Sequence, residues 1–101
     1  ARYLEAVIPE NGRAIRVASI YLPNGNPVDG PKFHYKLEWM EALTEHARAL
    51  LDYEEPTVLA GDYNVIPTSN DVHDPEAWAD DALFRPESRY RFNQLLHSGY
   101  L

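Results

Sequence analysis

The sequence of 101 residues contains no cysteine, and its single methionine is Met40. Disulfide bonds and thiolate metal sites are therefore excluded, and the composition fits a reducing compartment, so we expect a cytoplasmic protein. The sequence also lacks an apolar run long enough to cross a membrane, and we expect no membrane contact. Because the chain begins at Ala1 and Met40 lies within a predicted helix, we expect a segment of a longer protein.

Basic residues are also scarce, with nine Lys and Arg against sixteen Asp and Glu and a net charge of −7. Residues 1–51 are balanced, so the whole deficit lies in residues 52–101. Such a balance argues against broad, charge-driven binding of nucleic acid by this segment. Most of these acids are expected on a solvated surface, although a few could serve a divalent metal.

Strand and helix patterns alternate along the first two thirds of the chain. Strands are predicted at Arg2–Pro9 and Ala14–Tyr21, and Asn11-Gly12 between them is a hairpin turn signal. A helix is predicted from Lys32 to about Tyr53, because apolar residues recur there at steps of three and four. The short apolar run Thr57–Gly61 is typical of a buried central strand.

The remaining chain is predicted as a long connection followed by a second helix. Residues 64–85 are polar and irregular, with one helical turn expected near Trp78. Pro86 opens the last helix, and Gly99 caps its end. We therefore expect an α/β fold with helices packed on a sheet, and Asp29 is a candidate cap for the first helix. The strand that ends at Tyr21 is apolar on both faces, which predicts cover on both sides.

A carboxylate and a carboxamide follow the short buried strand, as Asp62 and Asn64. Residues two apart on an extended chain point the same way, so both could reach one ligand, with Gly61 allowing close approach. A carboxylate can accept a proton from water or bind a metal, and a carboxamide can orient a nucleophile. Taken alone, the spacing favours a plain turn, because Asp and Asn are both common in turns.

A second pair of polar residues follows the other buried strand. Tyr21 ends that strand, and Asn24 lies in a turn after Pro23. A tyrosine at such a place more often belongs to the core or its rim. If the two strands run parallel, however, both loops open at the same edge of the sheet, where α/β proteins bind ligands. The two pairs together therefore indicate a site more strongly than either pair alone.

Two lysines, Lys32 and Lys36, lie one turn apart near the start of the first helix. Cations there oppose the helix dipole, and a bound phosphate could offset that cost, but two solvated lysines are the favoured interpretation. None of the four histidines has metal-ligand spacing with another, and His73, beside two acids, is expected in solvent. The sequence contains no nucleophile-elbow, Walker-type or HExxH motif.

Taken in order, these stretches resemble the exodeoxyribonuclease III family of apurinic/apyrimidinic endonucleases, a branch of the endonuclease/exonuclease/phosphatase superfamily. The resemblance covers nearly everything from Ile15 onward. Other branches of the superfamily, such as sphingomyelinases and inositol phosphatases, have strand ends similar to GDYN, so GDYN alone does not distinguish the branches. The segments YLPNG and DALFRPESR narrow the resemblance to the exodeoxyribonuclease III branch. The matching segments are SIYLPNG (19–25), KFHYKLEWMEAL (32–43), VLAGDYNVIP (58–67), NDVHDPEAW (70–78) and DALFRPESRYRFNQLL (81–96).

The resemblance implies a four-layer α/β sandwich, in which two packed mixed sheets are flanked by helices. Residues 1–101 would be the central segment of one such domain, lacking its N- and C-terminal portions. In this family the residue matching Asp62 is the catalytic carboxylate, and the one matching Asn64 orients the attacking water and the phosphate. Tyr21 would bind the scissile phosphate with support from Asn24. Lys32 and Lys36 would lie near the DNA-facing surface.

The resemblance also implies the chemistry, which is metal-dependent hydrolysis of phosphodiester bonds at abasic sites and 3′ ends of duplex DNA. The cofactor would be Mg²⁺ or Mn²⁺, with Asp62 and Asn64 as partial ligands and the main ligands outside this chain. The whole protein would act as a monomer, and this segment alone would be inactive. The alternatives are a phosphodiesterase or phosphatase of the same superfamily acting on phospholipid or inositol phosphate, and a non-catalytic interaction module.

Overall fold

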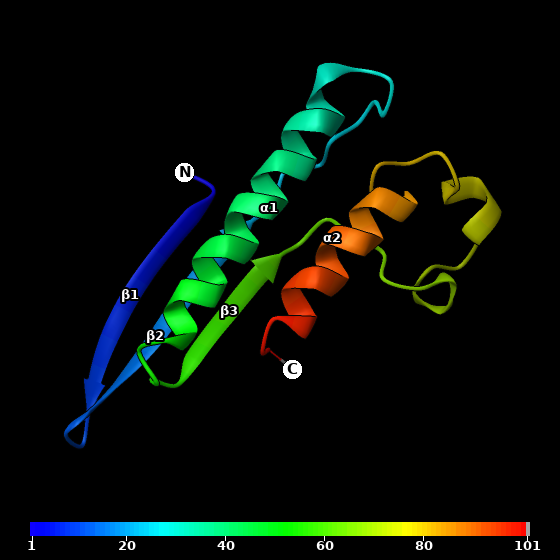
Figure 1. The fold of residues 1–101 in the computed structure, drawn as a ribbon. Helices are drawn as coiled ribbons and strands as arrows, with labels where there is room; N and C mark the ends of the chain where they lie inside the picture. The colour runs from blue at the N-terminus through cyan, green and yellow to red at the C-terminus, as the bar shows by residue number, and fades with distance from the viewer. Residues whose placement is uncertain (101) are drawn as a thin grey trace.

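The computed structural model describes residues 1–100, which form a three-stranded sheet and two α-helices. The predicted α/β class is confirmed, and element boundaries lie within about two residues of those expected (Figure 1). Two short 3₁₀ turns, Ser69–Asp71 and Pro75–Trp78, interrupt the long connection before the second helix. The elements are β1 (Tyr3–Glu10), β2 (Arg13–Tyr21), α1 (Pro31–Leu51), β3 (Thr57–Asp62) and α2 (Pro86–His97).

The sheet has the order β1-β2-β3 and mixes both kinds of strand pairing. β1 and β2 form the expected antiparallel hairpin, and Asn11 and Gly12 at its turn have φ values of 51° and 75°. β2 and β3 run parallel, with Tyr21 opposite Asp62 at their carboxyl ends. The shared edge was predicted on the condition that these two strands run parallel. They do, so the loops after β2 and β3 open at one edge of the sheet.

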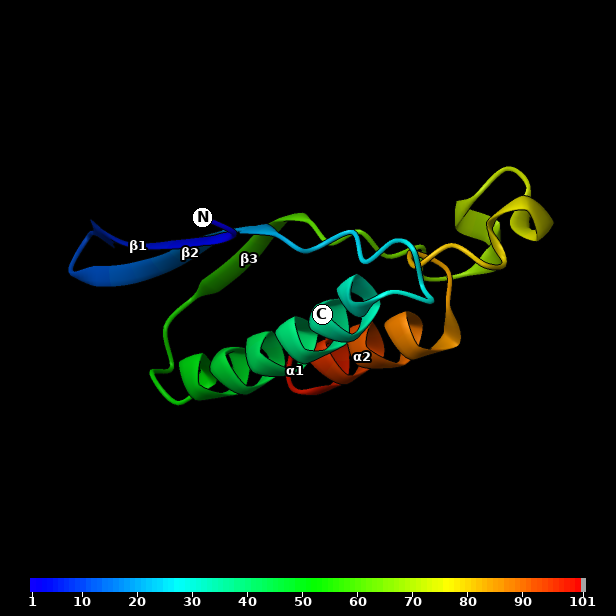
Figure 2. The ribbon, with the colours of Figure 1, turned by 90° about the horizontal axis from the view of Figure 1, so that it is seen from above.

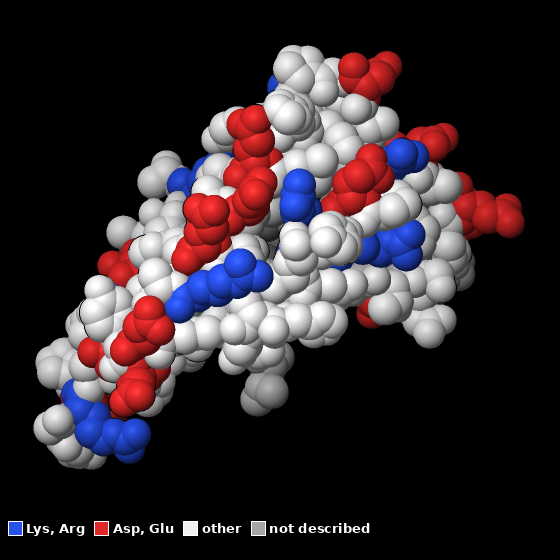
Figure 3. Space-filling view, viewed as in Figure 1, with Lys and Arg blue, Asp and Glu red and all other residues white. Residues whose placement is uncertain are grey.

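Both helices pack on the same face of the sheet, as Figure 2 shows from above. The apolar stripe predicted along α1 faces inward, because Met40, Leu43 and Ala47 are buried against Ile20 and Leu22 of the sheet side. On the outer face of α1, acidic side chains are visible in Figure 3, and Glu38, Glu41 and Glu45 are all exposed. That face is a solvated surface of the ordinary kind.

The opposite face of the sheet is apolar and uncovered within residues 1–100. Leu4 and Val58 expose 72% and 49% of their surface, and Tyr21 exposes 56%. The sequence of β2 predicted that both faces of the sheet are covered, and within residues 1–100 the helices cover one of them. Single exposed apolar residues are common, but a whole apolar sheet face in solvent is not.

The start of α1 differs from the expectation. Gly30, and not Asp29, occupies the N-cap position, and no side chain caps the helix. Pro31 opens the helix with a preset φ, and glycine at the N-cap costs only about a few tenths of a kcal/mol relative to a capping side chain. Within the described residues, no helix has both the length and the apolar character needed to cross a membrane.

Candidate active site at the strand ends

Tyr21 and Asp62 lie side by side on the open face of the sheet. They are direct partners in the parallel register of β2 and β3, and both are exposed. Ile20 points into the core beneath the helices, so its neighbour Tyr21 must point to the opposite face. Neighbouring strands are about 4.8 Å apart, so the phenol and the carboxylate can act on one ligand.

Gly61 is the residue that allows the two strand ends to come so close. Its φ is +146°, and a Cβ atom there would lie 1.9 Å from the backbone oxygen of Ile20. A side chain at this position would collide with β2 itself. The close approach predicted for Gly61 is therefore made to a neighbouring strand.

Asp62 and Asn64 are held in a turn, as their spacing taken alone favoured, and not in the extended geometry on which the shared-ligand interpretation was based. Asn64 has a φ of 47°, and its backbone N–H donates to Asp62 Oδ1 at 2.9 Å. The amide of Asn64 donates through Nδ2 to the carbonyl oxygen of Leu22, just after β2, at 2.7 Å. Among residues 1–100, Asp62 Oδ2 and Asn64 Oδ1 have no hydrogen-bond partner, so both remain able to accept. The turn and the site are thus one arrangement, since the turn leaves a carboxylate and an amide oxygen available.

The carboxamide of Asn24 is fixed with its oxygen inward. Asn24 Oδ1 accepts from the backbone N–H of Asn26 at 3.1 Å and from Asn26 Nδ2 at 2.7 Å. Asn26 also donates to Asp81 Oδ1 and accepts from the N–H of Ala82. The oxygen of Asn24 is therefore occupied, and its exposed NH₂ group, without a partner in the described chain, is left as a donor.

Lys36 lies under these loops and is fully buried, so the prediction that it is solvated is wrong. Its Nζ donates to the carbonyl oxygens of Asn24 at 3.0 Å and of Asn64 at 2.6 Å, with a longer contact of 3.5 Å to that of Ala82. Burial lowers the pKa of Lys36 to about 8, and the charges of Asp81 and Asp62 oppose that shift. Lys32, one turn earlier, is exposed as expected.

Two groups near the site carried no signal in the sequence. The guanidinium of Arg2 lies over the ring of Tyr21, 5.1 Å from its centroid, and donates to the Tyr21 carbonyl oxygen at 3.3 Å. An arginine before a strand has no distinctive pattern, so this cation could not be found by spacing. Asp81 and Ala82 belong to the DALFRPESR segment, which resembles the family, but the sequence does not indicate that both residues form hydrogen bonds with Asn26.

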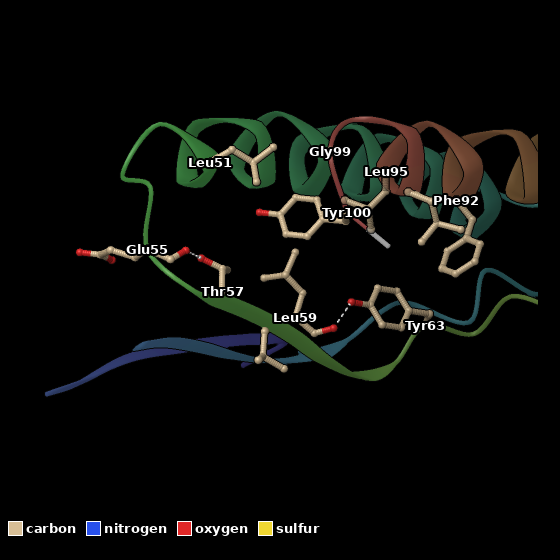
Figure 4. A pocket seen from close by; sticks show the side chains of 11 residues that line it. Leu51, Glu55, Thr57, Leu59, Tyr63, Phe92, Leu95, Gly99 and Tyr100 are labelled. Atoms are coloured by element: carbon tan, nitrogen blue, oxygen red, sulfur yellow. Dashed lines mark hydrogen bonds between the residues drawn. The ribbon is translucent and has the colours of Figure 1, made fainter. Parts of the chain in front are cut away.

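Tyr63, between the two candidate residues, turns to the other side of the chain. Figure 4 shows it in an apolar pocket between β3 and α2, where its hydroxyl donates to the carbonyl oxygen of Leu59. Its ring meets that of Phe92 edge to face, with centroids 5.6 Å apart. Burial raises the pKa of Tyr63, which suits a hydroxyl with a structural role. This pocket therefore belongs to the core, and the polar site lies elsewhere.

The donors present fit a hard cation only in part. Oxygen ligands such as the free atoms of Asp62 and Asn64 suit Mg²⁺ or Mn²⁺. However, no group of three or more His, Asp or Glu side chains in residues 1–100 could hold a metal ion. His73 is exposed, as the sequence indicated. Two oxygens from this chain could therefore contribute to a metal site without completing one.

Comparisons with known proteins connect this geometry to nucleases. The sequence profile of the endonuclease/exonuclease/phosphatase family matches residues 2–99. An exodeoxyribonuclease of Bacillus subtilis (strain 168) is 31% identical over 85 residues, covering 84% of this chain and 33% of the relative. The DNA repair nuclease APEX1 of Danio rerio is 42% identical over 50 residues, covering 50% of this chain and 16% of the relative. The chain thus spans about a third or less of these relatives.

Solved structures agree with the sequence relatives. An AP endonuclease from Archaeoglobus fulgidus superposes with a TM-score of 0.88 at 32% identity, over 99% of this chain and 37% of that one. The 3′ phosphatase NExo (D146N) from Neisseria, bound to a product DNA hairpin, gives a TM-score of 0.77 at 36% identity, over 84% of this chain and 33% of that one. These likenesses confirm the family resemblance found in the sequence.

Proposed function

This chain belongs to the endonuclease/exonuclease/phosphatase family, and on that premise we propose that its parent protein is a DNA repair nuclease. The reaction is hydrolysis of phosphodiester bonds at abasic sites and 3′ ends of duplex DNA. The observation that carries the proposal is the pairing of Tyr21 with Asp62 at two parallel strand ends. The relatives, which are named as an exodeoxyribonuclease, a DNA repair nuclease and an AP endonuclease, support it.

In this proposal each group of the site acts on one phosphate. The free oxygen of Asp62 takes a proton from the attacking water or returns one to the leaving oxygen. The amide oxygen of Asn64 orients that water, and the NH₂ group of Asn24 donates to a phosphoryl oxygen. The phenol of Tyr21 donates to the scissile phosphate, on which negative charge increases during reaction.

We propose Mg²⁺ or Mn²⁺ as the cofactor, to which Asp62 and Asn64 supply two oxygen ligands. When bound, such an ion stabilises charge on the phosphate. The remaining ligands would come from outside residues 1–101, consistent with the incomplete donor set described above. Residues 1–101 alone should neither bind the metal tightly nor cleave DNA, and turnover by this segment would contradict that expectation.

We further propose that residues 1–101 are the central segment of one domain with a four-layer α/β sandwich. The uncovered apolar face of the sheet supports this, because a second sheet would bury Leu4 and Val58. The fraction of each relative that the chain spans also supports it. We propose a cytoplasmic monomer that binds duplex DNA, with Lys32 as an exposed cation that contributes to the DNA-facing surface.

The test uses the full-length protein, an abasic duplex oligonucleotide and Mg²⁺. Wild type should nick the duplex, and Asp62→Asn should lower kcat by about 10³-fold or more because the catalytic carboxylate is lost. Arg48→Met is a surface control, because it removes an exposed cation from the last turn of α1, and it should keep kcat. Inositol phosphates serve as competing substrates, and faster turnover of these than of abasic DNA would refute a DNA nuclease. Unchanged activity of Asp62→Asn would refute the site.

A further inference from the structure

Lys36 joins three separate segments of the chain at one buried atom. Its Nζ is shared between the carbonyl oxygens of Asn24, in the loop after β2, and Asn64, in the turn after β3, with Ala82 in the long connection as the most distant partner. Ser88 of α2 donates to the same Ala82 oxygen at 2.6 Å, which connects the second helix to this point. Within the described chain no carboxylate lies within ion-pair distance of Lys36, so its hydrogen bonds are to backbone carbonyl oxygens, while the charges of Asp81 and Asp62 act from farther away.

Two of the three carbonyl groups belong to residues of the candidate site. A charge-assisted hydrogen bond to a carbonyl oxygen fixes the peptide plane, and with it the direction of the residue's own side chain. The Asn24 loop also rests on the lysine stem, because a Cβ atom at Gly25 would lie 2.6 Å from Lys36 Cδ. The ammonium and the stem therefore hold the two site loops from beneath, on the side of the sheet that carries the helices.

The hydrogen bonds of the Lys36 ammonium serve both the fold and the placement of the loops, so the two roles must be separated by experiment. A methionine would fill a similar volume without removing a charge from water, but it would leave the carbonyl oxygens of Asn24, Asn64 and Ala82 without these bonds. What an apolar residue cannot do is hold three carbonyl groups at fixed positions. We propose that Lys36 is a positioning residue that sets the placement of Asn24 and Asn64 for the reaction, an inference that depends on the nuclease function proposed above.

The test is a double-mutant cycle in the full-length protein, with Lys36→Met, Asn64→Ala and the combined variant. Single-turnover nicking of the abasic duplex with Mg²⁺ gives kcat and KM. Lys36→Met should lower kcat by about 10- to 100-fold, the range expected for displacement of a reacting group by about 1 Å, and should leave KM nearly unchanged. In the Asn64→Ala background the same change should lower kcat by less than about threefold, because coupled residues are not additive.

Two further variants separate this inference from its alternatives. Arg48→Met removes an exposed cation from the last turn of the same helix, away from the site loops, and should keep kcat. A full 10- to 100-fold loss in the Asn64→Ala background, or a Lys36→Met variant as active as Arg48→Met, would overturn the positioning role. If Lys36→Met does not fold, by circular dichroism and thermal melting, Lys36→Gln replaces it. Failure of both to fold would mean that Lys36 serves the fold alone.

Asp62→Asn shows which proposal has failed. If that variant keeps its activity, the proposed function has the wrong site. If it is inactive while Lys36→Met and Asn64→Ala act additively, the function stands and only the positioning role is wrong.

Discussion

The two ends of the sheet each contain a cation with little contact with water, and they hold it in different ways. At the carboxyl ends of β2 and β3, Lys36 is bound by backbone carbonyl oxygens alone. Toward the other end of β2, Arg16 forms ion pairs with Glu5 at 2.7 Å and Glu55 at 3.1 Å, and it stacks on the ring of Tyr53. Paired charges link side chains and support the fold, whereas the unpaired ammonium fixes the backbone of loops.

The glycines at the two ends allow the largest expected difference to be measured. Gly61→Ala should lower the free energy of unfolding by at least about 3 kcal/mol, because its Cβ would lie 1.9 Å from the Ile20 oxygen and its φ is positive. Gly12→Ala also has a positive φ but meets nothing within 4 Å, so about 1 kcal/mol is expected. Urea denaturation of the full-length protein gives both values.

Equal losses at Gly61 and Gly12 would mean that φ, and not the collision with β2, sets the cost. The strand ends at the site would then tolerate a substitution no less well than the β1–β2 hairpin turn does. A kcat measurement on the folded fraction of Gly61→Ala adds a second check, since any displacement of β3 also moves Asp62 away from Tyr21.

The ion-pair end should control the response to acid. Hydrogen bonds from Tyr3, His46 and Arg16 lower the pKa of Glu5 from 4.5 to about 2, against the effect of its burial. Because the folded-state pKa is the lower one, this stabilisation is fully present above about pH 4.5 and is lost as pH falls toward 2. Glu5→Gln should therefore lower the Tm by several degrees at pH 7, by less at pH 3, and have little effect at about pH 2 and below.

Activity separates the Glu5 network from the Lys36 end. Glu5→Gln should leave kcat on the abasic duplex within about twofold, because Glu5 and its partner His46 lie on the face of the sheet that carries the helices, opposite the face with Tyr21 and Asp62. A loss of kcat as large as that of Lys36→Met would show that the two ends are coupled. Thermal melts of both variants in the same buffers supply the comparison.

The sequence predicted the strand ends better than it predicted what lies beneath them. Tyr21 lies beside Asp62 in the parallel register, so the two polar strand ends that the sequence indicated do come together. The burial of Lys36 was missed because a lysine near a helix start is usually solvated. A signal was present, since Lys36 stands between Phe33 and Met40 at helical spacing and so lies on the apolar stripe.

Contacts that join distant segments carried no such signal. The bonds from Asn26 to Asp81 and Ala82 span 55 and 56 residues, and neither periodicity nor turn chemistry encodes a partner at that separation. The left-handed φ of Asn64 was open to prediction, because Asn tolerates it and GDYN reads as a turn. The sequence interpretation set a turn at Asp62 and Asn64 against a site, whereas the structure shows that the turn itself leaves acceptor oxygens available.

The last expected effect is the response of the Lys36 end to alkali. Burial lowers the pKa of Lys36 from 10.5 to about 8, although the charges of Asp81 and Asp62 oppose it. Between about pH 8 and pH 10 the unfolded chain then binds the extra proton, so stability should rise with pH there, by at most about 1.4 kcal/mol per pH unit. Above pH 10 the raised pKa values of Tyr63 and Tyr100 reverse the trend, because the folded state keeps their protons longer.

Activity should change in the opposite direction over the same interval. As Lys36 becomes neutral its hold on the Asn24 and Asn64 carbonyl groups weakens, so kcat should fall from about pH 8 while the protein becomes more stable. Lys36→Met should show neither the gain in stability nor this fall in kcat, and Arg48→Met should show both. Urea denaturation and single-turnover nicking at intervals from pH 7 to pH 10 measure the two curves. If stability and kcat of the wild type fall together, the ammonium supports the fold in the same way as Arg16, and the contrast between the two ends of the sheet is wrong.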